Sequence, residues 1–238
     1  MVLFQLTVTR FTQVYIAQGI VFVFFIYLIY KVLKTDRNKL KIIFCGYYIS
    51  EAIGIFINFI YAPLTNPDLV KILNFLTNFF IIFGTIFFMV FCLISFKGEE
   101  KLSPPKQLLI ILSYGVVLSF MIFIPEGVEI NADTGWLPHW SLTLFIYVMV
   151  VMTIFAVAPS FYYAIKIYQI IDDELLKKKW KFFIIGLIKL NIFLYGTFFS
   201  NTLHNPTFRI IWALISLYLA LSGSYLVYYG VGSKLKRI

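Results

Sequence analysis

Seven apolar runs, each long enough to cross a lipid bilayer as a helix, constrain this chain more than any other feature. About 20 helical residues span the roughly 30 Å of hydrocarbon. Large apolar side chains occupy every side of each run, without the polar and apolar alternation of a barrel strand. The sequence therefore predicts an all-α, polytopic membrane protein, a seven-helix bundle that forms one domain over residues 1–238. The predicted helices cover residues 12–31, 42–62, 72–96, 107–124, 141–166, 181–200 and 208–230.

The composition agrees with this class of protein. The chain is 61% hydrophobic and 13% charged, whereas soluble domains carry about 25% charged residues. Its net charge of +9 comes from cations between the apolar runs and not from a basic face on a soluble domain. We therefore expect the lipid bilayer as the surroundings of the chain and no nucleic acid as a partner.

The distribution of basic residues predicts the orientation. Of the 20 lysines and arginines, 16 follow the first, third and fifth runs or end the chain. Arg10, Lys71 and Arg209 are the three that flank the runs on the opposite side. Because cytoplasmic loops carry the excess of Lys and Arg, we expect the N-terminus outside, the C-terminus in the cytoplasm, and the protein in the cell membrane.

Two charged residues lie well inside predicted helices. Glu51 follows Lys41 by ten residues and Lys189 lies eight residues after Lys181, so both charges are expected at a similar depth from the same surface. A charge at such depth costs roughly 2.5–3.5 kcal/mol on insertion scales and often marks a functional site. Glu51 and Lys189 are therefore a candidate intramembrane charge pair. The alternative is that the long stem of Lys189 lets its ammonium reach the cytoplasmic interface.

A second group of polar residues is expected in the outer half of the bundle. These side chains could line a pocket, open to the outside, for a small polar ligand. Alternatively, they hydrogen-bond between helices, at roughly 0.6 kcal/mol each. The candidates are Gln13, Gln18, Asn58, Asn74, Asn78, Asn201 and His204.

The predicted outer loop at residues 125–140 is acidic, but its spacing matches no metal motif, so we expect no metal site. Its two tryptophans are expected at the membrane interface. The potential ligands are Glu126, Glu129, Asp133 and His139, and the tryptophans are Trp136 and Trp140.

The sequence gives little sign of catalysis. His139 and His204 form no paired metal motif, Cys45 and Cys92 have no nearby base, and neither a nucleophile elbow nor a phosphate-binding glycine loop is present. We expect no catalytic residues, no enzyme activity and no cofactor. Microbial rhodopsins attach retinal to a lysine in the seventh helix, and here no lysine lies between Arg209 and Lys234, so the chain is not expected to bind retinal.

Three features resemble the seven-helix sensor region at the N-terminus of some histidine kinases. They are the pair Gly135-Trp136 in the outer loop, the charged connection 172–181, and the ending Tyr228-Tyr229-Gly230 before a basic tail. The resemblance implies a ligand-sensing membrane module. Such regions lead into an output domain, whereas this sequence ends at Ile238, so the output is expected from a separate cytoplasmic partner.

These observations favour a sensor- or receptor-like membrane protein that binds a small extracellular ligand and signals to a cytoplasmic protein. Two alternatives remain. The chain could be a small transporter or ion-conducting protein whose path includes Glu51 and Lys189, or an accessory subunit that packs against another membrane protein. The sequence has no obvious inverted repeat of interrupted helices, which weakens the transporter hypothesis.

Overall fold

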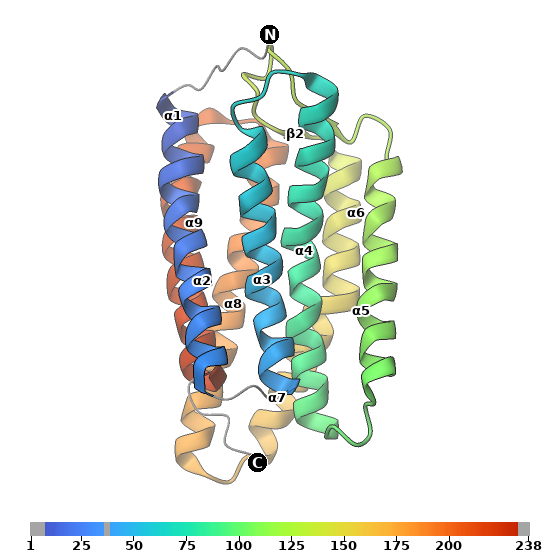
Figure 1. The fold of residues 1–238 in the computed structure, drawn as a ribbon, viewed down its shortest axis with the longest axis vertical. Helices are drawn as coiled ribbons and strands as arrows, with labels where there is room; N and C mark the ends of the chain where they lie inside the picture. Colours follow the sequence, from blue (N-terminus) through green and yellow to red (C-terminus); the bar gives the residue numbers. More distant parts are fainter. Residues whose placement is uncertain (1–7, 36–38, 233–238) are drawn as a thin grey trace.

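A computed structural model describes residues 8–35 and 39–232 of the chain. Within this part, seven helices are long and apolar enough to cross a membrane, and they run up and down as one bundle (Figure 1). The predicted all-α, multi-pass membrane fold is confirmed. The elements in chain order are α1 (Val8–Phe11), the π-helical η1 (Thr12–Ala17), α2 (Gln18–Thr35), α3 (Lys39–Tyr61), α4 (Pro67–Lys97), α5 (Pro104–Ser119), the 3-10 turn η2 (Phe120–Phe123), β1 (Val128–Glu129), β2 (His139–Trp140), α6 (Leu142–Met152), the π-helical η3 (Thr153–Val157), α7 (Ala158–Ile170), α8 (Glu174–Leu203), α9 (Pro206–Val227) and the π-helical η4 (Tyr228–Gly232).

Several helices begin earlier than the apolar runs because polar side chains cap their first turns. The Asp173 carboxylate accepts a hydrogen bond from the backbone N–H of Leu176, at 2.8 Å. It thereby starts α8 at Glu174 and not at the predicted residue 181. Asn66, Ser141 and Asn205 cap α4, α6 and α9 in the same way. Each cap satisfies a backbone N–H that has no partner within its helix.

The two ends of the bundle differ. One end, called here the hairpin end, carries the strands β1 and β2, and the opposite end, with the turns α4–α5 and α7–α8, is called the lysine-rich end (Figure 1). The strands pair antiparallel, with Val128 opposite Trp140 and Glu129 opposite His139. Residues 125–141 therefore form a structured cap over the helix ends.

The cap is anchored by apolar side chains. Trp140 is fully buried and its ring stacks on Phe198 of α8, with the ring centroids 5.0 Å apart. Ile130 is buried against Tyr61 and Val70. The expectation that Trp140 lies at the membrane interface is therefore wrong, because its ring has a better apolar partner inside the protein.

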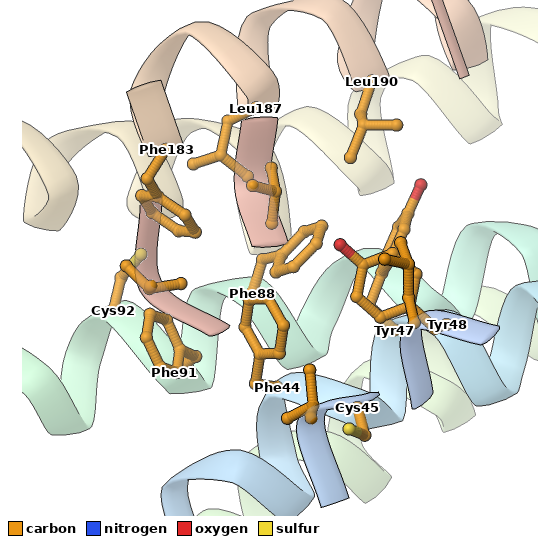
Figure 2. Close-up of a cluster of buried hydrophobic side chains, with 14 of the residues drawn as sticks. Phe44, Cys45, Tyr47, Tyr48, Phe88, Phe91, Cys92, Phe183, Leu187 and Leu190 are labelled. Carbon is orange, nitrogen blue, oxygen red and sulfur yellow. The ribbon is translucent and has the colours of Figure 1, made fainter. Parts of the chain in front are cut away.

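The half of the bundle nearest the lysine-rich end is filled by large side chains from α3, α4 and α8 (Figure 2). Tyr47 and Phe88 stack with their ring centroids 4.2 Å apart, and Phe91 contacts both Phe44 and Phe183. Stacked and edge-on aromatic pairs each add about 0.5–1.5 kcal/mol beyond the area they bury. This half is therefore a dense core, called here the aromatic core.

The helices α8 and α9 approach each other closely at two glycines. A Cβ added to Gly186 would lie 2.7 Å from the carbonyl oxygen of Gly223 and from the backbone nitrogen of Val227. Small residues at such points let helices pack in lipid, where no hydrophobic effect drives them together. The contact fixes how α9 lies against α8, and thus one wall of the bundle.

A methyl group at position 186 would collide with the backbone of α9. We therefore expect Gly186→Ala to destabilise the protein by about 1–3 kcal/mol, the usual cost of overpacking. Gly19→Ala is the matched control. Nothing lies within 4 Å of a Cβ at Gly19 of α2, so the better helix propensity of alanine should leave stability unchanged or raise it by up to about 1 kcal/mol. Thermal unfolding in nanodiscs measures both, and equal effects would contradict the close contact.

Candidate ligand-binding site

A cavity of about 230 Å³ lies inside the bundle, below the cap at the hairpin end. Its walls come from the first span (α1, η1 and α2) and from α3, α4, α8 and α9, and residues 136–138 of the cap cover it. On α3 it extends from Tyr61 down to Glu51, a distance along the helix of roughly 15 Å at 1.5 Å per residue. Its deep end adjoins the aromatic core.

Most of the polar residues proposed from the sequence meet at this cavity. They come from three of the helices that form its walls and from the first span. The lining includes Gln13, Gln18, Asn58, Asn74, Asn78 and Asn201. Helix depth narrowed the choice of residues, and the direction in which each side chain points decides which of them line the cavity.

The same side chains also bond to one another. Asn58 Nδ2 donates to Gln18 Oε1 and joins α3 to α2. Asn74 Nδ2 donates to the hydroxyl of Tyr61 at 2.8 Å, and Asn78 Nδ2 donates to Asn74 Oδ1 at 3.0 Å. The pocket and the interhelical hydrogen bonds thus coexist. These bonds fix the amides in place and leave further lone pairs and N–H groups facing the cavity.

Two arginines that the sequence analysis used only for orientation also line the cavity. Arg10 is 5% exposed and lies near Tyr61, with which it interacts electrostatically. Arg209, at the start of α9, donates from Nη2 to the carbonyl oxygen of Pro138 at 2.6 Å and so ties the cap to the helix. Both belong to the hairpin end. Their position just outside the apolar runs was the signal that could have identified them.

Glu51 forms the deep end of the cavity on α3. Its side chain is 1% exposed, and its Oε1 has no hydrogen-bond partner. Tyr47, one turn away, lies beside it and its hydroxyl interacts with the Glu51 carboxyl group, although no well-aligned hydrogen bond joins them. An unpartnered carboxyl oxygen buried at this depth is costly, which sets Glu51 apart from the paired amides above it.

Lys189 does not form an ion pair with Glu51. Its ammonium donates to the hydroxyl of Ser222 at 3.1 Å and to that of Tyr218 at 3.3 Å, and it lies 4.7 Å from the centroid of the Tyr218 ring. These partners are on α9, and Lys189 is not part of the cavity lining. Depth from the membrane surface predicted two charges at one level, but the packing of α8 against α9 decides the direction in which Lys189 points.

His204 is likewise outside the cavity lining, at the turn between α8 and α9. Its ring stacks on His139 with 4.2 Å between centroids, and its Nε2 lies 3.2 Å from the carbonyl oxygen of Trp140. Burial, followed by the nearby His204 and Arg209, lowers the pKa of His139, while Glu129 opposes the shift. A neutral His139 suits this stack, so the pair holds the cap against the helix ends.

Among the residues described, no three His, Cys, Asp or Glu side chains gather where they could hold a metal ion. No protein-family model matches the sequence, and no curated protein is significantly similar to it. The site is therefore interpreted from its own chemistry.

Because Glu51 and Lys189 share no partner, we expect the losses of stability in Glu51→Gln and Lys189→Met to add in the double variant, within about 0.5 kcal/mol. The control cycle is Lys189→Met with Ser222→Ala, which should be non-additive by about 0.5 kcal/mol or more because the two side chains are bonded. Thermal or denaturant unfolding in nanodiscs gives both values. Strong coupling between Glu51 and Lys189 would mean that a water-mediated interaction joins them.

Proposed function

We propose that this protein is a seven-helix sensor or receptor that binds a small ligand in the cavity below the cap and passes the change to a cytoplasmic protein. The observation that supports the proposal is the cavity itself, which combines converging amides, two arginines and a buried carboxyl group within largely apolar walls. Binding sites for small molecules usually have this composition. In the proposed orientation the hairpin end faces the outside of the cell, and the membrane is the cell membrane.

The volume of the cavity limits the size of the ligand. At roughly 30 Å³ for each water-sized group, about 230 Å³ accommodates about eight non-hydrogen atoms. This is the size of a small metabolite. Entry from the hairpin end would pass the cap, which Arg209 and His204 tie to the helix ends and which Trp140 and Ile130 anchor.

A route for signalling follows from the helices that the cavity and the aromatic core share. α3, α4 and α8 line the cavity and also supply the stacked rings of the aromatic core, and Tyr48 of α3 donates to the carbonyl oxygen of Ser224 on α9 at 3.1 Å. A ligand that shifts these helices at the hairpin end would displace the same helices at the lysine-rich end. The α7–α8 turn projects there beyond the neighbouring helix ends (Figure 1) and offers a surface to a partner.

Transport is less well supported by this arrangement. A transported molecule would have to pass the aromatic core, where Phe44, Phe91 and Phe183 are fully buried. Opening that path would break several ring contacts at once. A sensor needs a smaller change, namely a shift of helices that stay packed.

The orientation predicts which end of the bundle reacts with an impermeant thiol reagent in intact cells. Cys45 and Cys92 are fully buried and can stay in place as an unreactive background. Ala132→Cys in the cap should be labelled from outside, whereas Glu100→Cys in the α4–α5 turn should react only after the cells are permeabilised. The reverse pattern would invert the topology.

Filling the cavity should abolish ligand binding. We expect a screen of amino acids, short peptides, sugars and organic acids to yield a compound that raises the melting temperature of the protein in nanodiscs. Ala213→Trp, which places a large ring in the cavity lining, should remove this effect.

The matched control is Leu214→Trp, the neighbouring residue on α9, which is 72% exposed and outside the lining. It should keep the response to ligand. If no compound acts on the wild-type protein, the accessory-subunit hypothesis gains and the sensor hypothesis is overturned.

A further inference from the structure

We propose that the ligand is an elongated zwitterion, with a protonated amine at Glu51 and an anionic group at Arg209 and Arg10. This inference rests on the proposed function, because it names the class of ligand for the same cavity. It follows from three independent features of the cavity: the unpartnered groups at its deep end, the cations at its outer end, and the distance between them.

Among the described residues, the deep end of the cavity has no cation to balance Glu51. Glu51 Oε1 and, one helix away, Thr77 Oγ1 are both buried and have no hydrogen-bond partner, and both residues line the cavity. Lys189, the cation at a comparable depth, is bonded to α9. A carboxylate in low dielectric is stable when a cation supplies both charge and N–H groups. A primary ammonium has three N–H groups and can supply both the charge and the hydrogen bonds that Glu51 lacks.

The outer end of the cavity carries positive charge and requires an anionic group. Arg10 and Arg209 bring two positive charges to the lining, and Arg209 Nε has no hydrogen-bond partner although its Nη2 is bonded to the cap. Guanidinium groups bind carboxylate and phosphate groups through pairs of N–H donors. An amine without an anionic group would meet unfavourable charge at this end, and an anion without an amine would leave Glu51 unsatisfied.

The separation of the two ends sets the length of the ligand. Glu51 and Tyr61, which lies near Arg10, are ten residues apart on α3, or roughly 15 Å. The side chains that reach into the cavity from both ends shorten this gap. An α-amino acid, whose charges are separated by one carbon, is too short. The apolar residues between the ends, among them Val21, Ile55 and Leu217, suit a chain of methylene groups.

The test uses linear ω-amino acids with one, three, five and seven methylene groups, added to the full-length protein in nanodiscs. A monoamine and a monocarboxylate of matched length are the singly charged probes. We expect an optimum at three or five methylene groups, which give seven or nine non-hydrogen atoms, with binding at least tenfold tighter than that of either singly charged probe, the usual value of one charge-assisted bond.

Three variants assign the two ends. Glu51→Gln should abolish the tighter binding of the ω-amino acid relative to the monocarboxylate. Arg209→Gln should reduce its tighter binding relative to the monoamine. Glu51→Asp, a milder change that retains the charge, should move the optimum to a longer probe. Lys71→Gln is the control, because Lys71 is an exposed cation at the hairpin end outside the cavity lining, and it should change nothing.

The possible failures are distinguishable. If the monocarboxylate binds as tightly as every ω-amino acid, with no effect of Glu51→Gln, the zwitterion is overturned and the ligand is an anion, while the binding function stands. If none of these probes binds but the broader screen finds a ligand that Ala213→Trp blocks, the zwitterion is again overturned and the function stands. If neither series yields a ligand, both proposals fail.

Discussion

A polar group inside a bilayer has no water to bond to, and this constraint governs the arrangement of the whole molecule. It selects helices, which satisfy their own backbone groups, and it requires polar side chains to find partners within the bundle. Three hydrogen-bonded pairs meet this requirement: Gln18 with Asn58, Asn74 with Tyr61, and Lys189 with Ser222. Glu51 Oε1 is an exception, and the exception lies at the deep end of the cavity. A group that the protein leaves unsatisfied is one that a ligand can satisfy.

The bundle divides its residues by depth. The aromatic core occupies the half near the lysine-rich end, while amides and arginines gather in the half near the hairpin end. Rings such as Tyr47 and Phe88 interlock in few arrangements, so the core keeps the helices together as rigid units. Hydrogen-bonded amides are worth less each and can exchange a protein partner for a ligand. This division is the one that the proposed function requires, with binding in one half and transmission in the other.

The sequence predicted the features that depend on depth in the membrane. It failed where the rotation of a helix or tertiary packing decides the position of a side chain. Seven spans and the level of Asn74, Asn78 and Asn201 follow from counting residues along helices. The direction of Lys189 depends on the glycine contact between α8 and α9, which no count of residues reveals. Trp140 has the composition of an interfacial residue, yet the β1–β2 pairing turns it onto Phe198. The α8 helix begins at Glu174, before the apolar run at residue 181, because the Asp173 cap extends it.

The first span adds a further argument for a binding site at the hairpin end. Its residues Thr12–Ala17 form a π-helical turn, and Gln13, Val14 and Ala17 of that turn line the cavity. A π-helical turn has poorer hydrogen-bond geometry than an α-helical one and is found mostly where function requires it. The turn η1 begins two residues after Arg10, and Arg10, Trp136 and Pro138 also line the cavity. The π-helical turns η3 and η4 lie outside the cavity lining, so at η1 it is the position of the turn in the cavity wall, and not the turn itself, that supports a binding site.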